Sequence, residues 1–190
     1  MKPRQAAFAL IPVVFLSACG GGGQVGLSTE FATLVTEADR LSNDLAPLSA
    51  TPALPGSGGA TYTGVVILAD DFTTSTTGVV GTANLTANFN APAAISGTGT
   101  GFYQSGINAS GNPTGTGTPV GGSLNFTATG IGTTFPLAVA GTVTIDGTPR
   151  TINGTANGGF FGPNAEMVAA FGTDLPTTTT YDVDIAIVGD

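Results

Sequence analysis

The chain has 190 residues, a length suited to one domain, and only 8% of them are charged. It has no histidine and a single cysteine, which excludes Ser-His-Asp and Cys-His catalysis, disulfide bonds and the usual zinc, copper or iron-sulfur sites. The formal net charge is −8 with only four Lys and Arg, so the chain lacks the basic surface that nucleic acids require.

Residues 1–18 predict a lipoprotein signal peptide. Lys2 and Arg4 form a basic segment, and residues 6–15 form an apolar segment shorter than the roughly 20 residues that span a bilayer. The sequence "LSAC" then ends at Cys19 and resembles the bacterial lipobox, in which the signal peptidase cuts before an acylated cysteine. We therefore expect Cys19 to carry a lipid. An ordinary signal peptide with an incidental cysteine is the alternative.

Residues 19–27 are rich in glycine and predict a flexible tether between the lipid and the domain. Gly20 stands where an aspartate commonly retains lipoproteins in the inner membrane, so we expect the outer membrane, with the domain at the cell surface. The removal of Lys2 and Arg4 with the signal leaves Arg40 and Arg150 as the cations. Membrane attachment must therefore come from the lipid rather than from a basic patch.

Residues 28–46 predict an amphipathic helix, followed by a linker over residues 47–60. Apolar residues recur at helical spacing at Phe31, Leu34, Val35, Ala38, Leu41 and Leu45. Glu30 falls in the first turn, where the helix dipole favours an acid, and Pro47 ends the helix. We expect the apolar stripe to pack on the protein's own domain rather than on a partner.

From residue 61 the hydrophobic period changes to two, which is typical of half-buried antiparallel strands. Strands are predicted near residues 61–69, 79–90, 93–103, 122–130, 135–145, 149–158, 159–172 and 179–188. Asp146-Gly147 predicts a hairpin, and Gly162-Pro163-Asn164 predicts a second turn. The fold class is mainly β: residues 61–190 predict a single antiparallel barrel of about eight strands. A sandwich is the alternative, but glycines inside the strands favour the barrel.

Two acidic clusters are candidates for calcium, because hard cations take carboxylate ligands. Asp70-Asp71 and Asp182-x-Asp184 fit neither an EF-hand nor a Gly-Asp repeat, and Asp182 and Asp184 alternate with apolar neighbours as outward-facing residues would. We therefore expect solvated carboxylates. No metal, cofactor or catalytic residue is predicted.

The stretch "GGFFGPNAEMVAAFG", residues 158–172, resembles the signature near the end of the β-barrel domain of transferrin-binding protein B and its relatives. These relatives include factor H-binding protein and haem- or haemoglobin-binding surface lipoproteins of Gram-negative bacteria. Alanines replace the family's glycine pair at 169–170, and the likeness covers roughly residues 60–190. The matching residues are Phe160, Phe161, Gly162, Pro163, Ala165, Glu166 and Phe171.

The resemblance implies a monomeric surface lipoprotein that binds a protein, haem or an iron carrier, with an outer-membrane transporter as a candidate partner. An adhesive or structural cell-surface barrel without a small ligand is the alternative, and an enzyme is not expected. The missing histidine weakens the case for haem, because the residues left to ligate iron are Tyr62, Tyr103, Tyr181 and Met167.

Residues 104–122 form the longest segment without alternation, and long loops in compact domains are usually functional or disordered. Phe102 and Tyr103 stand at its root and are candidate aromatic anchors for a partner. A solvated linker without a role is the alternative. Glu166 follows the second turn, where we expect it to accept backbone N–H bonds at the barrel rim; a binding role for it is the weaker hypothesis.

Overall fold

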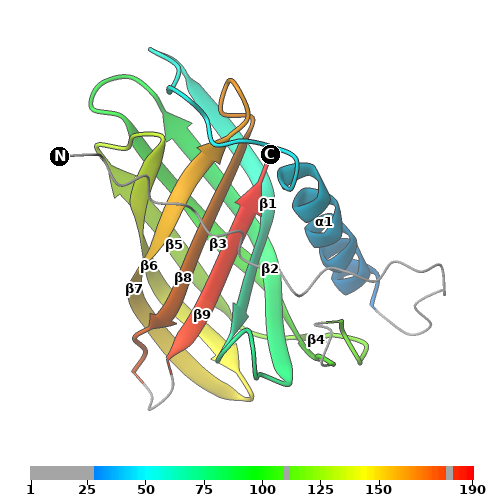
Figure 1. Ribbon diagram of the computed structural model, residues 1–190. Helices are drawn as coiled ribbons and strands as arrows, with labels where there is room; N and C mark the ends of the chain where they lie inside the picture. Colours follow the sequence, from blue (N-terminus) through cyan, green and yellow to red (C-terminus); the bar gives the residue numbers. More distant parts are fainter. Residues whose placement is uncertain (1–27, 109–111, 179–181) are drawn as a thin grey trace.

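A computed structural model describes residues 28–108, 112–178 and 182–190 (Figure 1). The predicted signal peptide, Cys19 and the glycine tether lie outside these residues. The elements are α1 (Thr29–Leu45), β1 (Gly59–Ala69), β2 (Thr77–Asn88), β3 (Ala94–Gly106), β4 (Thr118–Pro119), β5 (Gly122–Thr129), β6 (Thr134–Ile145), β7 (Thr148–Phe161), β8 (Met167–Leu175) and β9 (Val183–Gly189).

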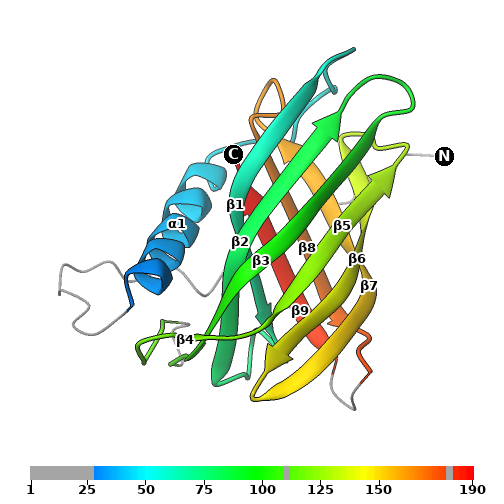
Figure 2. The same cartoon turned by 180° about the vertical axis from the view of Figure 1, so that it is seen from behind.

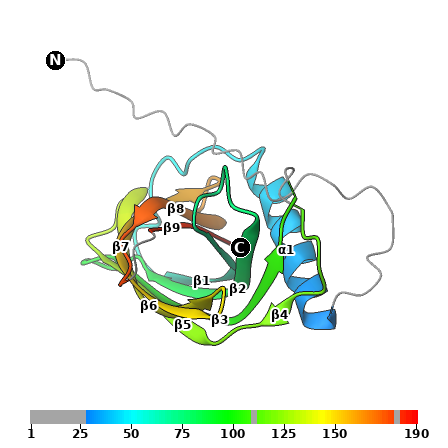
Figure 3. The same cartoon turned by 90° about the horizontal axis from the view of Figure 1, so that it is seen from below.

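The eight long strands form one closed antiparallel barrel. Each long strand pairs with the next along the chain, and β9 returns to pair with β1, from Gly64↔Gly189 to Ala69↔Asp184. The view along the axis shows the closed ring (Figure 3). The short strand β4 pairs only with β3, outside this ring. The predicted barrel is confirmed, and the sandwich alternative is wrong.

Helix α1 lies on the outside of the barrel, beside β1 and β2 (Figures 1 and 2). Ser28 caps it, because the Ser28 hydroxyl accepts a hydrogen bond from the Phe31 N–H, and the helix ends at Leu45, two residues before Pro47. Its buried side chains Phe31, Ala38 and Leu41 share one apolar cluster with strand residues Val65, Ile67, Val80 and Met167. The stripe packs on its own domain, as predicted.

The barrel interior is a packed apolar core. Strand alternation turns one set of side chains inward, and Tyr62, Phe102, Phe126, Phe135 and Phe160 are among the largest of them. Four of the aromatic rings gather near the β7–β8 end, where the Phe160 ring lies 5.1–5.9 Å from three neighbours. Eight strands leave an interior just wide enough for side chains to fill, so this core leaves little room for a ligand.

Close strand contacts explain at least one of the interior glycines. Gly141 on β6 has φ 150°, and a Cβ at this position would collide with the Ser123 carbonyl of β5. Only glycine therefore allows β5 and β6 to approach at this point.

The run over residues 159–172, which contains the predicted turn, is divided between two strands, so the strand boundary predicted between residues 158 and 159 is wrong. The chain leaves β7 at Phe161, turns over residues 162–165 and enters β8 at Met167. Gly162 and Ala165 both have positive φ, 82° and 59°, which reverses the chain. The turn predicted at Gly162-Pro163-Asn164 is confirmed. At the far end, Asp146 and Gly147 form the predicted hairpin turn, with φ 50° and 72°.

Two segments were predicted to be irregular, the linker over residues 47–60 and the segment over residues 104–122. Both form hydrogen bonds with the rest of the domain. In the linker, the Thr51 hydroxyl donates to the Gly162 carbonyl at 2.7 Å. After β3, the two residues of β4 pair back onto Tyr103 and Gln104, and the Ser28 N–H donates to the Thr116 carbonyl. The chain between β3 and β5 therefore packs against the start of α1.

Candidate functional site

A shallow apolar hollow lies where α1 meets the chain that follows β3. Phe31, Val35 and Ala38 of α1 line one side, and Ile107 and Pro113 line the other. The floor is formed by residues of β1, β2 and β3, namely Ile67, Gly78, Val79, Val80 and Ser105. We call this feature the α1 hollow.

The size of the α1 hollow limits what it can hold. Its volume is about 40 Å³, whereas pockets for drug-sized ligands and cofactors are roughly 300–1,000 Å³. Haem is far too large for it. A short aliphatic group from another molecule fits its apolar walls better than a polar group, because burying a polar group without a partner is unfavourable.

Phe102 and Tyr103 face opposite sides of the barrel wall. Phe102 is only 2% exposed and fills the interior, where a partner on the outer surface would not touch it. Tyr103 faces outward, half-buried, and its ring lies 6.1 Å from that of Phe31 on α1. Of the two predicted anchors, only Tyr103 therefore lies beside the α1 hollow.

A β-bulge sets which of these two aromatic residues points inward. The pairing of β2 with β3 shifts between Val80↔Tyr103 and Thr82↔Thr100, so two residues of β3 stand opposite Gly81 alone. Gly101 lies in this bulge with φ 65°. The extra residue reverses the inward–outward alternation and places Phe102 in the interior.

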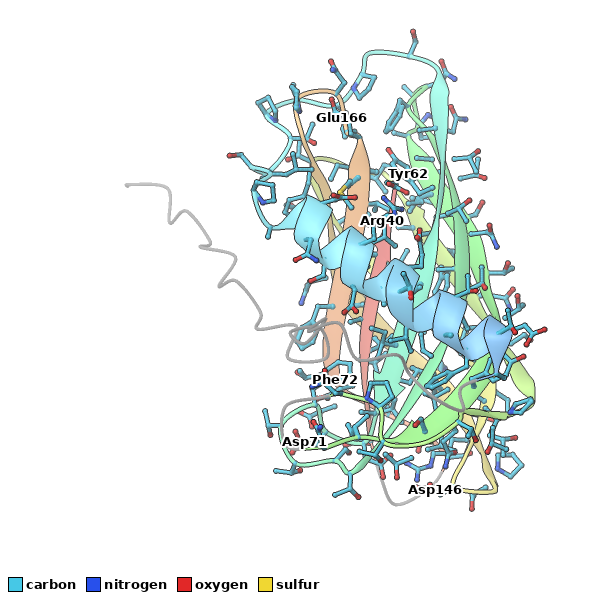
Figure 4. All side chains as sticks on the ribbon, turned by 90° about the vertical axis from the view of Figure 1, so that its right-hand side faces the viewer. Arg40, Tyr62, Asp71, Phe72, Asp146 and Glu166 are labelled. Carbon is cyan, nitrogen blue, oxygen red and sulfur yellow. The ribbon has the colours of Figure 1, made fainter. Side chains whose placement is uncertain are left out.

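Glu166 lies in the β7–β8 turn, at the end of the barrel opposite Asp71 and Asp146 (Figure 4). Its carboxylate accepts the Asn164 backbone N–H at 3.0 Å, as the sequence predicted, and the Asn164 side-chain amide at 3.1 Å. These bonds lower the pKa of Glu166, with the Asn164 backbone bond as the largest cause. Tyr103 and Glu166 are not brought together into one site.

Tyr62 supports the same turn from inside the barrel. Its hydroxyl donates to the Ala165 carbonyl at 2.7 Å, and both residues are almost fully buried. Burial, followed by the negative charge of Glu166, raises the pKa of Tyr62 to about 12. Iron ligation by Tyr62 would break this bond, and Met167 is covered, at 3% exposed. Tyr181 lies outside the described residues.

The carboxylates at the other end hold loops in place. Asp184 is 7% exposed and accepts the backbone N–H groups of Phe72 and Asp174, each at 3.0 Å. The expectation that it faces solvent is wrong: the β1–β2 loop, whose Phe72 ring stacks on Phe171, covers it. Asp70 pairs with the buried Arg150.

Asp71 organises the same loop through hydrogen bonds. It accepts bonds from the Thr73 backbone and hydroxyl and from the Thr74 hydroxyl, which lower the pKa of Asp71 to about 2, the Thr73 hydroxyl being the largest cause. Across residues 28–108, 112–178 and 182–190, no three carboxylate, imidazole or thiol groups are placed to share a metal ion.

Arg40 connects α1 to the last residue of the chain. Its guanidinium bonds Glu37 and Asp44 within the helix and both carboxylate oxygens of Asp190, at 2.8 and 3.0 Å. Figure 4 shows Arg40 at the edge of α1, on the side toward Tyr62 and Glu166. The bond to Arg40 lowers the pKa of Asp190. Because these side chains are 39–52% exposed, apart from Glu37 at 34%, each pair contributes little stability.

The fold and this surface define a class: a single-domain, closed eight-stranded antiparallel β-barrel with a packed interior and a helix on its outer wall. No known protein family matches the chain, and no curated protein does either. Within the described part of the chain, no helix is both long enough and apolar enough to cross a membrane.

Proposed function

We propose that the chain is a lipid-anchored lipoprotein of the outer membrane, exposed at the cell surface, whose barrel binds a protein partner and catalyses no reaction. The observation that carries this proposal is the α1 hollow, an apolar depression of about 40 Å³ on the outer wall beside Tyr103. Protein interfaces are commonly centred on a few buried apolar or aromatic contacts of this kind. An outer-membrane transporter or a secreted protein would supply the side chain that enters it.

The packed interior supports a protein partner over a small ligand. Tyr62, Phe102, Phe126 and Phe160 are each no more than 2% exposed and occupy the space in which a ligand-binding barrel of this size would hold its ligand. The packed interior therefore supports a binding surface on the outer wall. The same reasoning disfavours stoichiometric haem, so a haem titration that gives a saturable Soret shift at one equivalent would contradict this part of the proposal.

The anchor is tested separately from the binding surface. In cells fed a fatty-acid analogue, the wild-type chain should be labelled and should sediment with the outer membrane. Cys19→Ala should abolish the labelling. Persistent labelling of this variant, or sedimentation of the wild type with the inner membrane, would refute the anchor without affecting the α1 hollow.

The binding surface is tested by capture with two matched variants of α1. Val35→Asp places a charge in the α1 hollow, whereas Thr36→Asp places the same charge on the exposed neighbour. Tagged full-length chains capture proteins from solubilised outer membranes and from growth medium. The proposal requires a partner that wild type and Thr36→Asp retain and Val35→Asp loses.

Stability is followed in the same experiment, because Val35 also contacts the apolar cluster under α1. Thermal melting identifies any variant that unfolds, and Ile107→Ser provides a second change from the opposite wall of the hollow. Equal capture by Val35→Asp and Thr36→Asp, with both folded, would exclude the α1 hollow as the binding surface.

A second candidate function is an adhesive barrel, in which the strands themselves contact the cell surroundings. The observation that favours it is the uncharged outer wall formed by β2, β3 and β5, none of which contains a charged residue. The α1 hollow lies at one end of the β2–β3 pair, near Val80 and Ser105, and the inference that follows concerns the part of this wall toward the other end, from Asn84↔Thr98 to Thr86↔Ser96.

A further inference from the structure

The outward side chains of β2, β3 and β5 form an unbroken patch of amides and hydroxyls. Asn84 and Thr86 come from β2, Ser96 and Thr98 from β3, and Asn125 and Thr127 from β5; all six are exposed. Figure 2 shows these three strands side by side, with α1 away to one side. We call this patch the polar face.

The strand register aligns these side chains in two rows across the barrel. Asn84 stands opposite Thr98, and Thr98 stands opposite Asn125. Thr86, Ser96 and Thr127 form the parallel row. Neighbouring strands are about 4.8 Å apart and side chains two residues apart on one strand about 6.7 Å, so the rows form a regular grid.

The rows continue onto the next strand on each side. Thr61 and Thr63 of β1 stand opposite Thr86 and Asn84, and the Thr63 hydroxyl lies 3.5 Å from the Asn84 amide oxygen. On the other side, Asn125 and Thr127 stand opposite the small residues Ala140 and Ala138 of β6. An elongated molecule lying across the strands would therefore meet polar groups first and no bulky side chain.

The absence of charge on the polar face is unusual for so acidic a chain. The net charge is −8, yet β1, β2, β3, β5 and β6 contain no Asp, Glu, Lys or Arg. The acids of the described residues lie on α1, in the loops, at the C-terminus and on β8 and β9. An anionic partner would be repelled by these acids, and a cationic one would find no counter-charge on the face.

The chemistry of the patch also argues against a protein partner. Protein interfaces are enriched in aromatic residues, Met and Arg, and the six residues of the polar face include none of these. Amides and hydroxyls instead both donate and accept hydrogen bonds. They match a partner that presents many uncharged hydroxyl groups at regular intervals along an extended chain.

We infer that the polar face binds a neutral polysaccharide, with the sugar chain lying across β2, β3 and β5. Each contact exchanges a bond to water for a bond to a sugar hydroxyl, so each is weak and binding depends on many contacts along one polymer. The face therefore retains long polymers and not their monosaccharides. This inference does not depend on the α1 hollow, so a negative result for one surface leaves the proposal for the other unaffected.

Affinity electrophoresis tests the inference with the full-length chain. Native gels containing soluble neutral β-glucan, dextran or anionic alginate are compared with gels lacking polymer. We expect retardation by at least one neutral polymer, unchanged by raised salt and by glucose, and none by alginate. Retardation by alginate alone, or by no polymer, would overturn the inference.

Matched variants locate the contact. Asn84→Asp with Asn125→Asp adds two charges to the polar face without changing side-chain size, and Thr36→Asp with Asn43→Asp adds two charges on exposed positions of α1. The face variant should bind the neutral polymer roughly tenfold more weakly or worse, and the helix variant like wild type. Equal weakening in both, with both folded, would place the contact elsewhere and overturn the assignment to the polar face.

Sedimentation of the same proteins tests the alternative that the polar face binds a second copy of the chain. If the wild-type chain self-associates and only the face variant does not, the polar face is the contact between two copies and the polysaccharide inference is wrong. A monomeric wild type that the neutral polymer retards supports it.

Discussion

The hydroxyl of Tyr62 offers the sharpest test of how the β7–β8 turn is held. Tyr62→Phe keeps the ring, whose centroid lies 5.9 Å from that of Phe160, and removes only the donor to the Ala165 carbonyl. Ala165 is 3% exposed, so water cannot readily replace that donor. Leaving a buried acceptor unsatisfied costs about 1–3 kcal/mol. At about 2–4 °C per kcal/mol for a protein of this size, the melting temperature should fall by roughly 2–12 °C at pH 7.

The same hydroxyl predicts how stability changes at high pH. Folding raises the pKa of Tyr62 from 10.0 to about 12, so the folded state favours the protonated hydroxyl. This contribution is complete below pH 10 and is lost as the pH rises through 12. Tyr62→Phe lacks it, so the difference in stability between the two proteins should shrink over this interval. The one lysine of the chain, Lys2, belongs to the predicted signal peptide. Tyrosines therefore dominate the titration of the remaining chain over this pH interval.

Thermal melts followed by circular dichroism from neutral pH to the pKa of Tyr62 measure both effects, and the ultraviolet absorbance of tyrosinate follows ionisation. Tyr103→Phe is the matched control, because its half-buried side chain lies on the outer wall. If Tyr62→Phe melted like wild type at neutral pH and lost as much stability as wild type at high pH, the bond to Ala165 would have no role in stability.

Three further substitutions test other parts of the fold. Phe160→Ala removes a ring packed between three aromatic neighbours and should lower the free energy of unfolding in urea by about 3–5 kcal/mol. Asp184→Asn replaces one of two accepting oxygens by a donor; urea unfolding should show a loss of about 1–3 kcal/mol, with faster hydrogen exchange at Phe72 and Asp174. Arg40→Gln should lower the free energy of unfolding by less than about 1 kcal/mol near neutral pH. Because the bond to Arg40 lowers the pKa of Asp190 from 3.8, this difference between wild type and variant should be present above pH 3.8 and disappear as the pH falls further and Asp190 is protonated.

Local patterns were sufficient to predict the barrel, because several strands alternate and each long strand pairs with the next along the chain. Asp146-Gly147 fixes one hairpin, and the stripe on α1 fixes which helix face is buried. The strand boundary predicted between residues 158 and 159 is wrong because apolar residues continue across it, and β7 ends only at Phe161, before the turn with positive φ at Gly162 and Ala165. Alternation cannot place the end of a strand inside a continuous apolar run, although the Gly-Pro-Asn sequence marks the turn itself.

The candidate site was less predictable. In β3, Gly97, Gly99 and Gly101 carry no side chains to mark the inner face, so the bulge that turns Phe102 inward leaves no pattern in the sequence. The α1 hollow joins α1 to residues far along the chain, which periodicity cannot connect. A hint was present in Ile107 and Pro113, because apolar residues in a loop rich in glycine and threonine indicate that it packs on something.

The closed ring of neighbouring strands has a consequence for how the chain acquires its structure. Hairpins between consecutive strands can form as soon as each strand is available, because their contacts are local in sequence. The one seam among the described strands that joins distant parts is β1 with β9, which is the last of these strands in sequence order. Until β9 pairs with them, β1 and β8 remain open edges that can pair with other chains. Loss of β9 should therefore turn a closed barrel into a sheet prone to aggregation.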